Sequence, residues 1–333
     1  MSITIRRMER TDLPGVTRIW NASVNAREVV YAPMDHARYE SIFLSNPNYD
    51  PAFSLVAEKD SAIVGFINGI TKKVFLPKEH DGNTPGYITC IFVDKSVRGQ
   101  GLGTALLNAL LDAFRRAGKT SAVCSGGNPI NLDWIVPGTP GHDHNNAPGV
   151  DEDCAGHGFL LYSGFADAYR EVAMYLNLAE YRAPDNLDEL QIKLRGDGIE
   201  TGRYDPALGY DYDGMCDRVG SEYWRKVLRD ECAADHPRPI LAATHEGRIV
   251  GFTGPVDKQP SGRGWFTGIC TDPLYERRGI ATVLFNLLMQ EFIAEGAAFS
   301  TLFTGDDNHA QRLYARTGFR VARRFVIMKR ELE

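Results

Sequence analysis

The chain has 333 residues, of which 43% are hydrophobic and 24% are charged, and its formal net charge is −6 at pH 7. This length and apolar content suffice for two globular domains. The acidic balance excludes a surface built for nucleic acid or an anionic membrane, because both select for dense lysine and arginine.

Six cysteines are scattered through the chain with no Cys-x-x-Cys pair, so neither a zinc ribbon nor a dithiol redox site is indicated. Residues 1–8 alternate like a strand, which is not typical of a signal peptide. No apolar run approaches the roughly 20 residues that a membrane helix needs. We therefore expect a cytoplasmic protein with free thiols and no membrane contact.

The first half of the chain reads as a series of regular elements. Residues 2–8 alternate as a strand, 13–24 recur at helical spacing, and 54–58 with 62–71 predict a hairpin. Residues 86–93, rich in Tyr, Ile, Phe and Val, predict a buried strand. A glycine-rich turn, Arg98-Gly-Gln-Gly-Leu-Gly103, then opens an amphipathic helix over residues 104–116.

The same order returns in the second half. A hairpin over 240–244 and 249–253, a strand over 264–271 and the turn Arg277-Arg-Gly-Ile-Ala281 precede a helix over 282–294. A Gly-Phe pair closes each unit, at 164–165 and at 318–319. This internal repeat predicts an α/β fold with two copies of one domain.

We expect domains at residues 1–180 and 198–333, joined by a linker over 181–197, although residues 190–194 could instead extend the first sheet. The first copy is longer, and its extra residues fall between about 126 and 156. That stretch is rich in Pro, Gly and acidic residues with few apolar positions, which is typical of a functional or disordered loop. We expect it to fold over the first copy's cleft.

Four side chains of this insertion, His142, His144, Cys154 and His157, match no familiar zinc spacing. We therefore expect no metal site. The acidic residues among them would attract a cationic amine.

In each copy a strand runs through glycines into a helix, so the first backbone N–H groups of the helix are unpaired and point at one spot. The helix dipole adds positive charge there, and glycine lets the backbone approach a diphosphate closely. The two turns therefore predict anion sites.

The pattern Gln/Arg-x-x-Gly-x-Gly/Ala after a strand resembles the pyrophosphate loop of the GNAT superfamily of N-acetyltransferases. Residues 93–107 match it closely, and residues 271–282 are similar, except that Glu276 stands where the family has Gln or Arg. The resemblance implies two GNAT acyl-CoA N-acyltransferase folds in tandem, each with a mixed α/β sheet.

The resemblance also implies the residues that bind acetyl-CoA. In such enzymes the strand before the loop splays from its neighbour, and its backbone holds the thioester. The expected set is Ile91, Phe92, Val93, Arg98, Gly99, Gln100, Gly101, Leu102, Gly103 and Thr104 in the first copy, and Ile269, Cys270, Thr271, Arg277, Arg278, Gly279, Ile280, Ala281 and Asn308 in the second.

A second family signature, a helix that ends in Tyr-x-x-x-Gly-Phe, is carried by residues 314–319. The resemblance implies that Tyr314 is the general acid that protonates the departing thiolate; the alternative is an aromatic anchor for its helix. The first copy has Leu160 at that place, with Tyr162 two positions away. Neither predicted central strand contains Asp or Glu, so we assign no general base.

The function that follows is acetyl transfer from acetyl-CoA to a primary amine, most simply that of a small molecule, by a monomer or a homodimer. The alternatives are an acyl-CoA-binding sensor or scaffold without turnover, and a protein acetyltransferase acting on lysine or an N-terminus.

Overall fold

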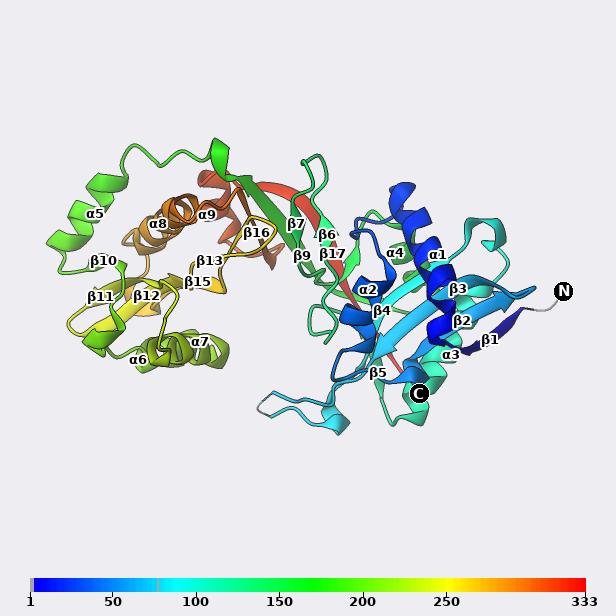
Figure 1. Cartoon of the computed structure of the whole chain (residues 1–333). Coiled ribbons are helices and arrows are strands. Elements are labelled where there is room, and N and C mark those ends of the chain that lie inside the picture. The colour runs from blue at the N-terminus through cyan, green and yellow to red at the C-terminus, as the bar shows by residue number, and fades with distance from the viewer. Residues whose placement is uncertain (1–2, 77) are drawn as a thin grey trace. The chain divides into compact units, whose positions relative to one another are not determined.

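The computed structural model describes residues 3–76 and 78–333 (Figure 1). The chain divides into two compact units, each of mixed α/β structure: residues 1–173 together with 322–333, and residues 174–321. Each unit contains one copy of the repeat. Within the described part of the chain, no helix has the length and apolar character to cross a membrane.

The first unit is built on a mixed sheet in the order β1-β2-β3-β4-β5-β17-β9 (Figure 1). Its strands are β1 (Thr4–Arg7), β2 (Ser54–Lys59), β3 (Ala62–Ile70), β4 (Gly86–Val93), β5 (Ser121–Cys124), β9 (Ala166–Asn177) and β17 (Arg320–Glu331), of which the last two continue into the other unit. The helices are α1 (Leu13–Asn25), α2 (His36–Tyr39), α3 (Leu102–Arg116) and α4 (Ala155–Tyr162).

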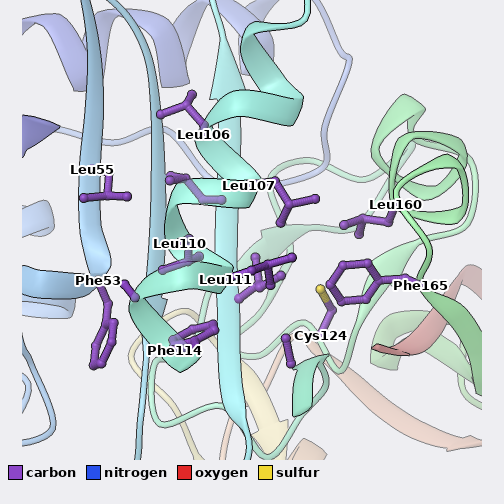
Figure 2. Packing of buried hydrophobic residues seen from close by; sticks show 14 of the residues in the cluster. Phe53, Leu55, Leu106, Leu107, Leu110, Leu111, Phe114, Cys124, Leu160 and Phe165 are labelled. Carbon is purple, nitrogen blue, oxygen red and sulfur yellow. The ribbon is translucent and has the colours of Figure 1, made fainter. Parts of the chain in front are cut away.

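Both faces of this sheet are covered, which explains the unbroken apolar runs of β3 and β4. Leu55 and Ile88 point into a core formed with α3, whereas their neighbours Val56 and Tyr87 point into a second core formed with α1. Figure 2 shows the α3 side, where the leucines of that helix face the strands. The helix begins two residues earlier than predicted because Leu102 is buried with the others.

The last strand of the chain completes the first unit's sheet. β17 pairs antiparallel with β5, with Met328 opposite Cys124 and Glu331 opposite Ser121. Val326, Met328 and Leu332 are buried in the α3 core. The first unit therefore depends on residues from the far end of the sequence, which the repeat did not predict.

The insertion is ordered, and the prediction of a loop with little to pack was wrong. It contains β6 (Trp134–Ile135) and β7 (Asp143–His144), which pair with each other, and β8 (Val150–Asp151), which pairs with β17. Trp134 is fully buried, and its indole N–H donates to the carbonyl of Asn146 at 2.9 Å. The segment is thus an integral layer of the first unit.

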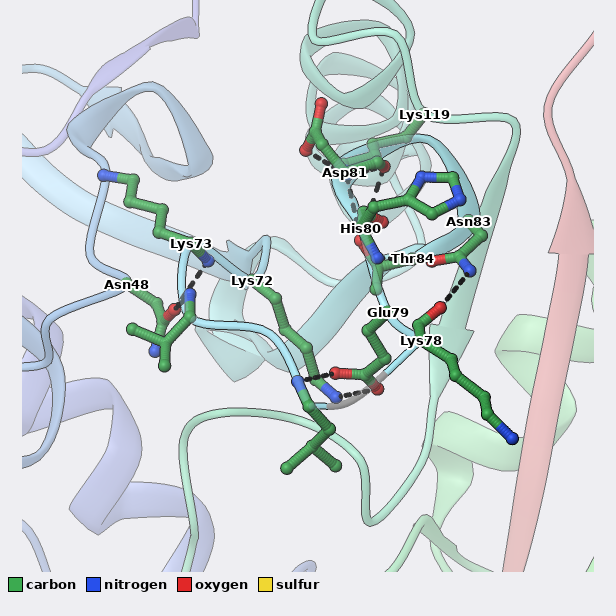
Figure 3. Close-up of polar contacts among 12 residues, drawn as sticks. Asn48, Lys72, Lys73, Lys78, Glu79, His80, Asp81, Asn83, Thr84 and Lys119 are labelled. Carbon is green, nitrogen blue, oxygen red and sulfur yellow. Dashed lines mark hydrogen bonds and ion pairs between the residues drawn. The ribbon is translucent and has the colours of Figure 1, made fainter.

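The connection between β3 and β4 is tied down by polar contacts, which Figure 3 shows. The buried ammonium of Lys119 donates to the carbonyl and the carboxylate of Asp81, both at 2.7 Å. The side-chain oxygen of Asn48 accepts from the N–H of Lys73 at 2.7 Å. These bonds fix the entry into β4, the central strand.

The second unit repeats the plan, but its sheet is divided. One part has the order β10-β11-β12-β15 and the other β9-β16-β14-β13. Its strands are β10 (Glu200–Arg203), β11 (Leu241–His245), β12 (Arg248–Gly254), β13 (Asp257–Lys258), β14 (Arg263–Trp265), β15 (Gly268–Thr271) and β16 (Phe299–Gly305). The helices are α5 (Leu187–Gly196), α6 (Asp213–Val219), α7 (Glu222–Ala233), α8 (Ile280–Ala294) and α9 (Gln311–Arg316).

Two predictions for the second half need correction. The single strand expected over 264–271 is two strands, β14 and β15, because the first half pairs with β16 and the second with β12. The expected linker contains helix α5, so residues 190–194 are helical and do not extend the first sheet.

The two copies share one packing device. A Cβ on Gly86 would lie 2.5 Å from the ring of Phe114, and a Cβ on Gly264 would lie 2.6 Å from the ring of Phe292. In each copy, a phenylalanine ring of the long helix therefore packs directly against a glycine of the strand that precedes the turn. This close approach sets the distance between the helix and the sheet.

Candidate active site

The first unit's sheet opens beside β4. β4 pairs with β5 only through Gly86 and Tyr87, opposite Ala122 and Val123, while on its other edge β4 stays paired with β3 as far as Val93. The stretch from residue 88 to residue 93 therefore has no strand partner on the β5 side. The backbone N–H groups on that edge, within the predicted set Ile91, Phe92 and Val93, are available to a ligand, whereas the carbonyl of Val93 already accepts from Arg98.

The turn after β4 has the geometry of an anion site. Gly99 and Gly101 adopt left-handed φ angles of 74° and 79°. The first helical bond runs from the N–H of Ala105 to the carbonyl of Gly101 at 3.0 Å, so the N–H groups of Leu102, Gly103 and Thr104 have no partner within α3. A Cβ on either left-handed glycine would meet nothing within 4 Å, which leaves open space in front of these donors.

A cavity of about 840 Å³ joins the two features. It is lined by nine of the ten residues expected to bind cofactor in the first copy; Gln100, which is exposed, is the exception. The lining members are Ile91, Phe92, Val93, Arg98, Gly99, Gly101, Leu102, Gly103 and Thr104.

Arg98 lies at the cavity but is already paired. Its guanidinium forms an ion pair with Glu28 at 2.7 Å and donates to the carbonyl of Val93 at 2.8 Å. The hydrogen bond from Arg98 lowers the pKa of Glu28, so this carboxylate stays charged at neutral pH. Arg98 thus ties the end of β4 to the segment after α1, and its contact with a diphosphate stays a prediction.

The cavity is also lined by residues that no motif identified, among them Tyr31, Cys90, Cys124, Asp151 and Arg323. Burial raises the pKa of Cys124 to about 12 and also raises that of Cys90, so both thiols are protonated at neutral pH.

Arg323 comes from β17 and donates to both carboxylate oxygens of Asp151 in the insertion, each at 2.9 Å. The insertion and the C-terminal strand therefore both contribute to this site, as the insertion was expected to do.

The second unit keeps the backbone of the turn with different side chains. Gly279 has φ 96° and caps α8, which begins with Ile280 and Ala281. Arg277, at the position of Gly99, also has a left-handed φ of 61°. Arg278 and Glu276 are exposed beside it.

The surroundings of this second turn are more crowded. A Cβ on Gly279 would lie 3.4 Å from the side chain of Leu190 on α5, whereas the same position at Gly101 is open. On β15, Ile269, Cys270 and Thr271 all pair with β12. These positions keep their predicted place before the turn.

Tyr314, the predicted general acid, lies on α9 with 7% of its surface exposed. Its ring centroid is 5.0 Å from that of Phe285, and its hydroxyl has no hydrogen-bond partner among the described residues. Burial raises the pKa of Tyr314 to about 12, so the phenol is protonated at neutral pH. In the first unit Leu160 is buried at the matching place and Tyr162 is 86% exposed.

Asn308 precedes α9, and its side-chain oxygen accepts from the N–H of Ala310 at 2.9 Å. This is a local turn contact, and the role of Asn308 toward a cofactor stays a prediction.

The histidines of the insertion have structural contacts. His144 is buried with its ring stacked on Trp134, and His157 lies 3.0 Å from Asp167. Over residues 3–76 and 78–333, no group of three or more His, Cys, Asp or Glu side chains is arranged to hold a metal ion.

Both units place a strand, a turn with a left-handed glycine and the N-terminus of a long helix in succession, so one α/β domain is repeated in tandem. Residues 18–132 and 210–319 each match the model of the Acetyltransferase (GNAT) family, so together the matches cover more than half of the chain. The protein belongs to the GNAT family and contains two GNAT domains. A comparison with curated proteins found no match to the sequence.

Solved structures show the same fold. The chain is similar to the glucosamine N-acetyltransferase region of a fungal multi-domain beta-N-acetylglucosaminidase, with TM-score 0.68 and 17% identity over 99% of this chain and 38% of that one. It is also similar to an N-acetyltransferase of Sphaerobacter thermophilus, with TM-score 0.62, 17% identity, and 99% and 96% coverage. A tandem GNAT protein of clavulanic acid biosynthesis gives TM-score 0.56, 14% identity, and 100% and 99% coverage.

Proposed function

We propose that the protein is a cytoplasmic acetyl-CoA-dependent N-acetyltransferase that acetylates the primary amine of a small molecule, and that its first unit binds acetyl-CoA. The observation that supports this is the cavity that connects the unpaired edge of β4 with the N-terminus of α3. Acetyl-CoA presents a diphosphate and a thioester, and these two features of the cavity suit one each.

In this proposal the protein positions acetyl-CoA and the amine and donates hydrogen bonds to the cofactor. The N–H groups of Leu102, Gly103 and Thr104 hold the diphosphate, assisted by the α3 dipole. The free N–H groups of β4 between Ile91 and Val93 donate hydrogen bonds to the acyl carbonyl. These hydrogen bonds become stronger as negative charge develops on the carbonyl oxygen. An amine held against the thioester reacts without a second loss of translational freedom.

The cavity's lining also suits an amine. Asp151, Asp153 and Arg323 all line it, and the one guanidinium pairs with both carboxylates, so this group keeps a net negative charge that favours a cationic amine nearby. We also propose a second acetyl-CoA site in the other unit. It is formed by the second-copy residues expected to bind the cofactor, with Tyr314 as its general acid.

Glycine-to-glutamate variants test the assignment. Gly101→Glu, made in a Gly279→Glu background so that only the first unit can bind, places a side chain and a negative charge where the diphosphate would bind. We therefore expect acetyl-CoA affinity to fall at least about 100-fold relative to Gly279→Glu alone, the loss of a few charge-assisted hydrogen bonds. Calorimetric titration with acetyl-CoA measures it. Gly138→Glu is the control, because Gly138 has a similar φ of 74° and lies equally open, but in the insertion.

Gly279→Glu tests the second unit in the same way. If Gly279→Glu abolishes binding and Gly101→Glu leaves it intact, the cofactor site is in the second unit and the proposal for the first is wrong. Release of CoA in the presence of glucosamine, spermidine or free lysine then separates transfer from binding alone.

A further inference from the structure

Tyr31 is held rigidly in the wall of the first unit's cavity. The N–H of Ala32 donates to the carbonyl of Asp133 at 3.1 Å, and the N–H of Ile135 donates to the carbonyl of Val30 at 2.8 Å. Trp20 of α1 adds a bond from its indole N–H to the carbonyl of Ala32 at 2.9 Å. The backbone on both sides of Tyr31 is thereby fixed to the insertion and to α1.

The ring of Tyr31 is equally constrained. Its centroid lies 5.4 Å from that of Trp20 and 6.5 Å from that of Phe92, which belongs to the unpaired stretch of β4. These contacts leave the aromatic ring packed in the protein while the side chain lines the cavity. The ring is thus positioned beside the strand proposed to hold the thioester.

The hydroxyl of Tyr31, in contrast, makes no hydrogen bond to any of the residues that the structure describes. The indole of Trp134 donates to Asn146, and the hydroxyl of Tyr181 donates to Asn286 at 3.0 Å, whereas the hydroxyl of Tyr314, the predicted general acid, has no partner among the described residues, as is the case for Tyr31. A fixed phenol facing a cavity without a partner therefore points to a role toward what the cavity binds.

The groups around this hydroxyl keep it protonated. Burial raises the pKa of Tyr31 well above its usual value, and the neighbouring thiols of Cys154, Cys90 and Cys124 and the carboxylate of Asp151 raise it further. Asp151 is in turn paired with Arg323. The thiols come from β4, from the end of β5 and from the residue before α4, and all three cysteines line the same cavity as Tyr31.

We propose that Tyr31 is the proton relay of the first unit, replacing the tyrosine that this unit lacks at Leu160. The proposal rests on the proposed function. The amine nitrogen forms a bond to the acyl carbon, and the bond from that carbon to sulfur breaks. The Tyr31 oxygen takes the proton lost by nitrogen and gives its own proton to sulfur, so the phenol is regenerated and no further reactant is needed.

The environment requires both transfers to occur together. A free tyrosinate beside Asp151 and away from water would be strongly disfavoured. A relay in which one proton arrives as the other leaves avoids that charge. The same hydroxyl, when it donates to the sulfur, stabilises the thiolate as it departs.

The kinetic test uses Tyr31→Phe in a Gly279→Glu background, so that only the first unit turns over. The ring and its packing are kept, and only the hydroxyl is removed. With acetyl-CoA and the amines named above, we expect kcat to fall by about 10²–10⁴-fold, while the acetyl-CoA dissociation constant changes less than about twofold. Tyr169→Phe is the matched control, since Tyr169 is an exposed tyrosine of the same unit that does not line the cavity.

A second readout needs no amine. CoA labelled with ¹³C at the carbon bonded to sulfur reports ionisation of its thiol when bound. A hydrogen bond that favours the thiolate lowers its pKa, so we expect the bound thiol to titrate about one unit higher in Tyr31→Phe than in Tyr169→Phe. Cys90, Cys124, Cys154, Asp151 and Arg323 are unchanged in both variants and contribute equally.

The outcomes separate the two proposals. If Gly101→Glu in the Gly279→Glu background still binds CoA as Gly279→Glu alone does, the first unit is not the cofactor site and the proposed function fails. If that double variant loses CoA but Tyr31→Phe retains both kcat and the thiol pKa of the control, the relay is wrong and the proposed function stands. A matching loss in Tyr169→Phe would also overturn the relay.

Discussion

Arg277 adopts a strained backbone conformation in the turn of the second copy. The first copy has Gly99 at this place with φ 74°, and Arg277 adopts φ 61° although it carries a side chain. A left-handed conformation costs an ordinary residue roughly 1–2 kcal/mol, because its Cβ approaches the following carbonyl. The turn before α8 is therefore kept at a cost in stability.

Exchanging the residue types at these two positions tests this. We expect Arg277→Gly to raise the free energy of unfolding by roughly 0.5–1 kcal/mol, because relief of the strain is partly offset by the freedom of glycine in the unfolded chain. Gly99→Arg should lower it by a similar amount. Urea unfolding curves measure both, and equal stability of the parent and both variants would show that the turn is unstrained.

Asp94 is the first residue after β4 and makes stability depend on pH. Its carboxylate accepts from Arg18 at 2.7 Å and from the N–H and hydroxyl of Ser96 at 3.0 and 2.8 Å. These bonds lower the pKa of Asp94 from 3.8 to about 2. A carboxyl whose pKa is lower in the folded state stabilises that state above the unfolded value and loses the effect as pH falls through the folded one.

We therefore expect Asp94→Asn to cost about 1–2 kcal/mol at pH 7, allowing for the solvent that reaches Arg18. The difference from the parent should shrink between about pH 4 and pH 2. Denaturant unfolding over that range measures it, with the exposed Asp112→Asn as control. A cost that is the same at pH 2 and pH 7 would mean that the Asp94 charge contributes nothing.

At the level of elements, the insertion behaves as part of the core. Trp134 is fully buried, packs against Phe325 of β17 at 5.3 Å, and donates to Asn146. Replacing a buried tryptophan with alanine typically costs 3–5 kcal/mol. We expect Trp134→Ala to lower the stability of the first unit by about that amount, whereas Pro137→Ala at the exposed tip should change it by less than about 0.5 kcal/mol.

Thermal unfolding with acetyl-CoA present and absent checks this prediction. Because residues of the insertion, among them Ala147, Gly149, Val150, Asp151, Asp153 and Cys154, line the cavity, the Trp134 variant should also lose part of the stabilisation that acetyl-CoA provides. Deleting residues 137–149 removes Asn146 and His144, which contact the buried Trp134, so we expect this deletion to destabilise the first unit. A deletion variant as stable as the parent would return the insertion to the status of a surface loop.

Elements whose pattern is local were predictable, and those decided by a distant partner were not. The strand Gly86–Val93 has the predicted bounds, because a short run of β-branched, aromatic and other apolar residues between two turns predicts a buried strand. Residues 190–194 alternate Leu, Gln, Ile, Lys, Leu, which is typical of a strand, yet Leu187 and Leu194 are the buried pair of a helix. That periodicity becomes clear only when the residues before 190 are included.

The candidate site divides in the same way. The glycine turn was predictable because the glycines that its left-handed conformations require are adjacent in the sequence. The part of the cavity wall formed by β4 was predictable as well, because β4 directly precedes this turn. Tyr31, Asp151 and Arg323 carry no motif, since they meet through the pairing of β8 with β17 and the backbone bonds around residue 31. A tyrosine far from any glycine motif gives no sequence signal of its own.

For the molecule as a whole, the route of the chain matters most. The chain leaves the first unit after residue 173, forms the second, and returns at residue 322 to supply the strand beside β5. Without β17, the backbone of β5 from Ser121 to Cys124 would lose its antiparallel partner, and apolar surface of the α3 core would be exposed. The expected boundary at 180 would separate the first unit from its own strand.

This arrangement predicts how fragments fold. We expect residues 1–180 alone to lack a cooperative thermal transition, because an unpaired strand edge and the missing side chains of Val326, Met328 and Leu332 together remove several kcal/mol, which is much of the stability of a typical domain. Residues 1–173 joined to 322–333 by a glycine-serine linker should recover a cooperative transition, measured by circular dichroism and calorimetry.

The control for this rescue is the same joined chain with Val326→Asp and Met328→Asp. Both side chains are fully buried, so the charged strand cannot enter the α3 core without a large desolvation penalty. It should behave like residues 1–180. If residues 1–180 already unfold cooperatively at the temperature of the joined chain, β17 adds nothing to the first unit, and the boundary expected from the sequence repeat is the better description of how this protein folds.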